Sequence, residues 1–259
     1  PLSRHVRHPF NYPFSDTLPP ALSELATKVH AGAGALTPLF GRTQYDVVAA
    51  GLVATLSKDL WGWSKDVLLY VRPTTLRITA NGYAVLASRR DIQRIVSDFA
   101  AYYRDRLAAY AARDQYPMNG PVEIRVTGLD VPSDVDDGAA SPPALSAVRP
   151  RPDHPEWDVA VWLDVLTIPG TPYANQLYQE IETWLLSRYA DAAVRPEWSK
   201  GWAFTDAGAW MNESVLTRSI PDAYRAGQTA GDDWDWAVAT LAAYDPHRIF
   251  SNEFLDRLF

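Results

Sequence analysis

The chain has 259 residues, of which 47% are hydrophobic and 21% charged, a balance typical of a folded protein with a sizeable core. Its formal net charge is -7 and it contains no basic block, which argues against a nucleic-acid partner. It has no cysteine, so disulfides and cysteine-ligated metal sites are excluded. No apolar run is long enough for a membrane span, and we expect at most peripheral membrane contact. The chain begins with Pro1 rather than Met, so we expect a processed or excised part of a longer polypeptide.

Helices and strands are predicted in chain order from the spacing of apolar residues. After an extended, Pro-rich start, helical spacing predicts helices over Leu18–His30, Thr43–Leu56, Asp91–Ala112 and Tyr173–Tyr189. Strands are predicted at Asp66–Val71, Thr75–Thr79, Tyr83–Ala87, Val122–Val126 and Asp158–Thr167. The Asn81-Gly82 pair predicts a hairpin turn between two of these strands, because both residue types tolerate positive φ. Together these elements predict an α+β fold with a large mixed or antiparallel sheet and helices on one face.

The strand Val122–Val126 alternates between apolar and charged residues. We expect its Val and Ile side chains to face the core, with Glu123 and Arg125 side by side on the other face. Two interpretations of this charged pair remain open. It is either a solvated edge of the sheet or a charged couple directed into a cleft, where a catalytic carboxylate is tuned.

Other charged residues also lie in apolar or aromatic surroundings. Asp164 shares a predicted strand face with Trp162 and Leu166, and Glu197 and Lys200 lie three apart among Trp residues. Glu197 and Lys200 could face one another in an active site, or form a structural salt bridge beneath a Trp cluster. A carboxylate held by Arg beside an apolar pocket suits removal of a proton from an alcohol, or from a carbon next to a carbonyl.

Several familiar site types are absent from the sequence. There is no His pair at metal-ligand spacing, since His5 and His8 lie in a Pro-flanked segment, and we expect no metal site. There is no Gly-x-Ser-x-Gly elbow and no Gly-x-Gly-x-x-Gly motif, so neither an α/β-hydrolase nucleophile nor a nicotinamide site is supported.

The segment Asp245–Phe254 resembles the C-terminal motif of FAD-linked oxidases of the vanillyl-alcohol oxidase superfamily. Over the whole chain, four further segments resemble the substrate-binding (cap) half of the bacterial cholesterol oxidases that carry covalently attached FAD. These segments are Trp61–Tyr83, Met118–Arg125, Leu166–Pro172 and Arg195–Trp202.

The resemblance implies roles for individual residues. Glu123 is implied to act near the steroid hydroxyl as a base or proton acceptor, and Arg125 to lie over the flavin and stabilise its reduced anion. Glu197 and Lys200 are implied to belong to the same catalytic network, with Lys200 also among the cofactor-binding residues. Asp164 falls near the position where we expect the family to have a substrate-facing Asn. A carboxylate there is a departure that bears on substrate preference or on the alignment.

The resemblance also implies a domain organisation. Residues 1–190 correspond to the substrate-binding domain, and residues 191–259 to a C-terminal segment that packs against the FAD-binding domain, with Asn252 near the cofactor. That FAD-binding domain, with its pyrophosphate loop and flavin-linked His, is not in this chain. The implied partners are therefore an N-terminal FAD-binding chain or domain of the same precursor, a sterol and molecular oxygen. The implied location is secreted or periplasmic.

The expected reaction is oxidation of a 3β-hydroxysteroid to the 3-ketone, with a Δ5 to Δ4 shift and H2O2 production. Two alternatives remain open. The same fold could oxidise a different alcohol, because fold does not fix function. The chain could also be an isolated, non-catalytic fragment that binds an apolar ligand.

Overall fold

A computed structural model describes residues 5–8, 20–54, 60–63, 78–132, 141–189 and 193–259. The strands are β1 (His5–His8), β2 (Leu60–Trp63), β3 (Thr79–Ala87), β4 (Val122–Gly128), β5 (Val159–Thr167) and β6 (Val194–Pro196). The helices are α1 (Pro20–His30), α2 (Thr37–Ala54), α4 (Ile92–Ala111), α5 (Ala174–Arg188), α6 (Ile220–Arg225), α7 (Trp234–Tyr244) and α8 (Glu253–Leu258). Short 3₁₀ turns lie at Gly34–Leu36 and Arg89–Asp91, and a π-helical turn lies at Val215–Ser219.

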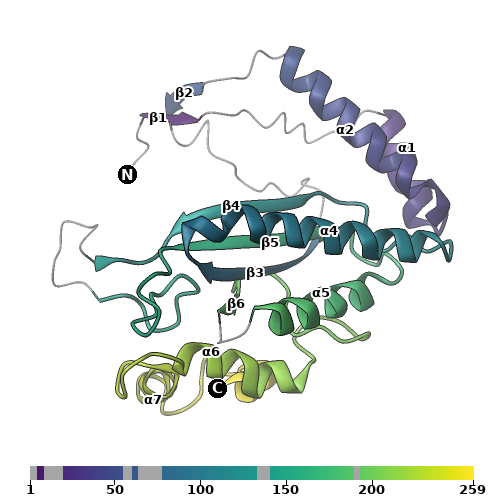
Figure 1. Cartoon of the computed structure of the whole chain (residues 1–259). Helices are drawn as coiled ribbons and strands as arrows, with labels where there is room; N and C mark the ends of the chain where they lie inside the picture. Colours follow the sequence, from purple (N-terminus) through teal and green to yellow (C-terminus); the bar gives the residue numbers. More distant parts are fainter. Residues whose placement is uncertain (1–4, 9–19, 55–59, 64–77, 133–140, 190–192) are drawn as a thin grey trace.

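A four-stranded antiparallel sheet in the order β4-β5-β3-β6 forms the centre of the molecule (Figure 1). Strand β5 pairs along its whole length with β3, from Val159 opposite Ala87 to Thr167 opposite Thr79. The mixed helix-and-strand fold with helices flanking an antiparallel sheet confirms the predicted class.

The helices cover one face of this sheet. Its alternate residues Tyr83, Val85, Val161 and Leu163 are buried in one core with side chains from α4, α5 and the last three helices. Residues i, i+2 and i+4 of a strand lie on the same face, so this alternation explains why one face can be fully apolar. The opposite face is covered only in part, by Ala147 and neighbouring side chains of the segment between β4 and β5, packed on Ala84, Leu86 and Ala160.

Helices α1 and α2 lie side by side, away from the sheet (Figure 1). Their small core contains Leu22, Val29 and Phe40, with Ile168 packed against it. The predicted second helix is confirmed, but it begins earlier, at Thr37. No helix in the described part of the chain is long and apolar enough to cross a membrane. The predicted strand Asp66–Val71 lies outside the described residues.

The predicted hairpin at Asn81-Gly82 is wrong. Strand β3 runs through both residues, and Gly82 pairs with Asp164 of β5. A Cβ on Gly82 would lie 2.6 Å from Asp164 Oδ1 and 2.8 Å from Lys200 Cγ. A glycine within a strand also marks close approach of other groups, and here that requirement, not a turn, accounts for it.

The expectation that the Val/Ile face of β4 lies in the core is also wrong for most of the strand. Ile124 and Val126 are 38% and 45% exposed, and only Val122 packs against the core. The reason is that β4 is the outer strand, paired only with β5, so its far end extends beyond the helical layer. Alternation in the sequence predicts the strand but does not show what covers either face.

The C-terminal region is continuous with the main core. Strand β6 pairs with β3, and Trp234 of α7 and Leu258 of α8 join the same cluster as the sheet. The division of the chain at residue 190, with the last segment packed on another domain, stays a prediction.

Glu182 of α5 is buried beneath the sheet, where it accepts a hydrogen bond from the Tyr83 hydroxyl. Burial raises the pKa of Glu182 to about 7, against the opposing effect of its hydrogen bonds, from an ordinary value of 4.5. The folded protein therefore holds this proton more tightly than the unfolded chain. Glu182 therefore contributes its full stabilisation at pH values below its pKa in the unfolded chain. This stabilisation is lost as the pH rises through its pKa in the folded protein.

The free energy of unfolding of the wild type should fall between pH 5 and pH 8 as Glu182 ionises. In Glu182→Gln, which cannot ionise, we expect this fall to be smaller by about 2 to 3 kcal/mol. Denaturant unfolding at the two pH values measures this difference. Glu180→Gln, on the same helix, removes a half-exposed partner of Arg106 and serves as the control. An unchanged pH dependence in the Glu182 variant would contradict the assignment.

Candidate functional site

One guanidinium nitrogen joins two carboxylates on the less covered face of the sheet. Arg125 of β4 donates through Nη2 to Asp164 Oδ2 of β5, and the same nitrogen lies 2.6 Å from Glu197 Oε2. Glu197 follows β6, and its backbone N–H donates to Gly82 O of β3. The cluster therefore draws on all four strands of the sheet, so its geometry depends on strand register.

The three ion-paired side chains of the cluster differ sharply in exposure. The Asp164 side chain is 0% exposed, Glu197 is 13% exposed and Arg125 is 47% exposed. Because Asp164 is buried and Arg125 is half exposed, the Arg125 guanidinium is the group that contacts solvent or a ligand. The Arg125 guanidinium carbon also lies 5.5 Å from the Trp162 ring, which limits its movement.

Burial raises the pKa of Asp164 to about 7, and Glu197 adds to the rise through a hydrogen bond and charge repulsion, whereas Arg125 opposes it. Two carboxylates on one cation carry a net negative charge, so protonation of Asp164 near neutral pH relieves their repulsion. The arrangement can accept or release one proton without a large movement.

Gly82 is a site residue that the sequence interpretation missed. It lies directly beneath Asp164 and Lys200, and any larger residue there would displace one of the two side chains. The signal was present in the sequence as a glycine among strand residues, but the preceding Asn81 made a turn seem the better explanation.

The remaining predicted residues occupy different places. Glu123 is exposed, lies opposite Asp164 in the strand register and attracts the Arg125 charge. Lys200 lies beside Gly82 at the end of a turn whose backbone bond joins Lys200 N to Glu197 O at 2.9 Å. Among the described residues, the Glu197 carboxylate pairs with Arg125 and Ser199, and no ion pair joins it to Lys200.

Among the described residues, no hydrogen bond or ion pair joins Asn252 to this cluster. Its side chain caps α8 by accepting a 2.9 Å hydrogen bond from the backbone N–H of Leu255. A cofactor contact from Asn252 stays a prediction. No group of His, Asp or Glu in the described part of the chain could hold a metal ion.

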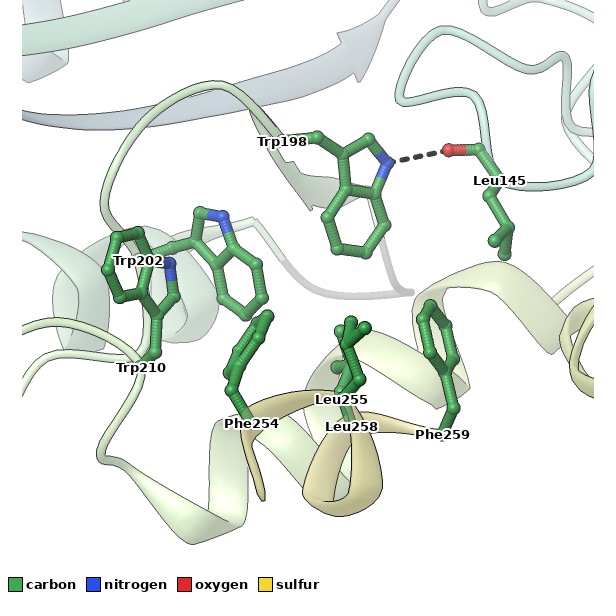
Figure 2. A pocket seen from close by; sticks show the side chains of 8 residues that line it. All are labelled: Leu145, Trp198, Trp202, Trp210, Phe254, Leu255, Leu258 and Phe259. Atoms are coloured by element: carbon green, nitrogen blue, oxygen red, sulfur yellow. Dashed lines mark hydrogen bonds between the residues drawn. The ribbon is translucent and has the colours of Figure 1, made fainter. Parts of the chain in front are cut away.

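An apolar pocket of about 310 Å³ lies between α8 and the segment that follows β6 (Figure 2). Trp198, Trp202 and Trp210 line it from one side, and Phe254 and Leu255 of α8 from the other. The Trp198 indole N–H donates to Leu145 O at 2.7 Å, which fixes the ring at the rim. Trp198 follows Glu197 directly, so one short segment contributes to both the charged cluster and this pocket.

The titration of Asp164 tests the charged cluster. We expect its carboxyl carbon to titrate near pH 7 by NMR, with Asp164→Asn used to assign the signal. Because Arg125 lowers this pKa and Glu197 raises it, Arg125→Ala should move the midpoint up and Glu197→Gln should move it down. Shifts in the same direction for the two variants would show that the carboxylates do not share the cation.

Comparisons with known proteins point to one family. Residues 1–259 match the family described as "Cholesterol oxidase, substrate-binding". The structure is similar to that of a protein called "Solvent-stable cholesterol oxidase", with 60% sequence identity, a TM-score of 0.91, and coverage of 96% of this chain and 47% of the other. It is also similar to cholesterol oxidase from B. sterolicum, with 44% identity, a TM-score of 0.89, and coverage of 99% and 48%.

The chain thus spans about half the length of these solved structures. None of the curated proteins compared with it matches. With the family match over every residue and a fold shared at 44% to 60% identity, the chain belongs to the cholesterol oxidase substrate-binding domain family.

Proposed function

We propose that this chain is the sterol-binding part of an FAD-dependent oxidase that converts a 3β-hydroxysteroid to the 3-ketone. The observation that carries the proposal is the bridge from Arg125 to Asp164 and Glu197 on the open face of the sheet, in a chain of this family. We also propose that the reaction includes the double-bond shift from Δ5 to Δ4 and forms H2O2. Both proposals follow from the resemblance and from the acid–base groups present.

The residues present fit a flavin at the open face. Arg125 is half exposed, and among the described residues its hydrogen bonds to protein all come from Nη2. Its remaining N–H groups can therefore meet a ligand. An uncovered cation suits the negative charge of a reduced flavin, and Lys200 lies in the same cluster. When bound, FAD supplies the two-electron oxidation, while the protein supplies binding, orientation and electrostatics. Covalent attachment of FAD would fall to the part of the enzyme outside this chain.

The carboxylates of the cluster provide the acid–base chemistry. We propose that the exposed Glu123 accepts the proton of the sterol hydroxyl, which makes the alcohol carbon easier to oxidise. The Δ5 to Δ4 shift needs one group that removes a proton from C4, next to the new carbonyl, and returns a proton to C6. Glu197, which is 13% exposed, can reach the substrate, and Asp164 beside it can hold a proton near neutral pH because its pKa is raised to about 7.

The surface of the C-terminal region supports packing against the missing half. Ile249 and Phe250 are 73% and 81% exposed, although both backbone N–H groups are held by the Asp245 carboxylate at 2.8 Å. Large apolar side chains on an ordered loop favour an interface over a solvated surface. We therefore propose that residues 191–259 contact the N-terminal FAD-binding domain or chain, with Asn252 on that side.

The aromatic pocket favours a second candidate function. A cavity of about 310 Å³ lined by Trp, Phe and Leu suits a flat apolar ligand, whether or not a flavin is present. An apolar-ligand-binding protein without turnover would keep this pocket and lack the flavin chemistry. The two functions are separated by the absorption spectrum and by sterol-dependent H2O2 release.

The test of the proposed function uses the full-length protein. We expect visible flavin absorption bands and H2O2 release with 3β-hydroxysterols, at a higher kcat/KM than with a panel of other alcohols. Glu123→Gln should lower kcat on the order of 10²-fold or more with little change in stability, since general base catalysis contributes about this much. Arg125→Ala should mainly slow flavin reoxidation.

Three outcomes would contradict the proposal or the roles of its residues. A flavoprotein that oxidises other alcohols but no sterol would keep the fold and change the substrate class. A colourless protein that binds sterol without turnover would favour the apolar-ligand binder. Equal loss of folding in both variants would give Glu123 and Arg125 a structural role.

The space above Gly82 offers a second test. We expect Gly82→Ala to lower kcat on the order of 10²-fold, because the added Cβ displaces Asp164 or Lys200 from its position. The matched control is Gly128→Ala in β4, where an added Cβ has nothing within 4 Å. Steady-state kinetics and thermal unfolding of both variants measure the effect. Similar kcat values for the two would show that the cluster tolerates displacement.

A further inference from the structure

The turn that carries Glu197 and Lys200 leaves the sheet at one end and enters the core at the other. At its start, Glu197 N donates to Gly82 O at 3.0 Å, and at its end Gly201 N donates to Ala80 O at 2.7 Å. The chain then turns inward through Ala203, which is fully buried. Ala203 has φ of 53°, a left-handed conformation that is unfavourable for a residue with a side chain.

Buried polar side chains on the helical face of the sheet accept hydrogen bonds from the backbone at Ala203 and Phe204. The backbone N–H of Ala203 donates to the Tyr83 hydroxyl at 3.3 Å, and that hydroxyl donates to Glu182. The next backbone N–H, of Phe204, donates to the same Glu182 carboxylate at 3.3 Å. On its other side, Ala203 O accepts from the N–H groups of Met211 and Asn212.

This arrangement links the two faces of the sheet. Tyr83 follows Gly82 in β3, and successive side chains of a strand point to opposite faces. The Tyr83 side chain therefore lies on the helical face, whereas Gly82 faces Asp164 and Lys200 on the other face. Glu182 reaches the same point from α5 and is 1% exposed. Neither residue lies on the face that carries Arg125 and Asp164, so neither is placed to touch a substrate bound there.

We propose that Tyr83 and Glu182 are positioning residues that fix the turn 197–204, and through it Glu197 and Lys200, in the charged cluster. They act by accepting hydrogen bonds from two consecutive backbone N–H groups at a left-handed residue. These bonds stabilise a single conformation of the turn. The effect on turnover rests on the proposed function. The effect on the turn itself does not, since it depends only on these hydrogen bonds.

The test compares two buried tyrosines in the full-length protein. Tyr83→Phe removes the hydroxyl that holds Ala203. Tyr178→Phe removes the hydroxyl of an equally buried tyrosine, which donates instead to Thr79 O at 3.1 Å. Amide hydrogen exchange without substrate should rise about tenfold in the peptide covering 197–204 for Tyr83→Phe, as expected for the loss of one buried hydrogen bond. Tyr178→Phe should leave that peptide unchanged.

Kinetics supply the second measurement. Tyr83→Phe should lower kcat by on the order of tenfold to a hundredfold, because small misplacements of catalytic groups cost this much, while KM changes far less. Glu182→Gln, whose amide oxygen can still accept both hydrogen bonds, should stay near wild type in exchange of the peptide and in kcat. Equal effects of the two tyrosine variants on the 197–204 peptide, or no effect of either, would overturn the proposal. If the wild-type protein oxidised no sterol, the proposed function would fail while the exchange comparison still decided the positioning role.

Discussion

The placement of one guanidinium on two carboxylates depends on the whole sheet. Arg125 comes from the outer strand β4, Asp164 from β5, and Glu197 from the end of β6, while β3 runs between the last two. A slip of one residue in any pairing would move a member of the cluster to the opposite face. The apolar alternation that buries one face of each strand against the helices therefore also fixes the charged groups on the other face.

The two faces of the sheet differ in composition and in exposure. The helical face is apolar and closely packed, apart from the hydrogen bonds of Tyr83 and Glu182, which reach the segment beyond Lys200. The other face leaves β4 and its Arg125 accessible, and the chain spans about half the length of its structural relatives. A rigid layer behind an open charged face is suited to holding catalytic groups against a second, separately folded part of an enzyme.

The sequence predicted the class of fold and most of the helices, because their apolar spacing reflects burial of one helix face, against the main core for α4 and α5 and in a separate small core for α1 and α2. It also predicted that Asp164 lies within an apolar strand face, and the structure places it at 0% exposure. It could not show that Gly82 lies within a strand, since a glycine that permits a turn and one that permits close packing look alike. Nor could it show that Ile124 and Val126 are exposed, because position at the edge of a sheet depends on strand order. The Tyr83 and Glu182 pair, separated by 99 residues, had no sequence signal beyond a polar residue on an apolar helix face.

We propose that the open face carrying Arg125 lies against a flavin in the full-length protein. The most direct measurement is the midpoint reduction potential of the flavin in the wild type and in Arg125→Ala. A nearby cation stabilises the reduced anion, so the variant should have a potential lower by on the order of 30 mV or more, about 1.4 kcal/mol for a two-electron couple. An unchanged potential, in a variant that folds and retains flavin, would place Arg125 away from the cofactor and contradict the account.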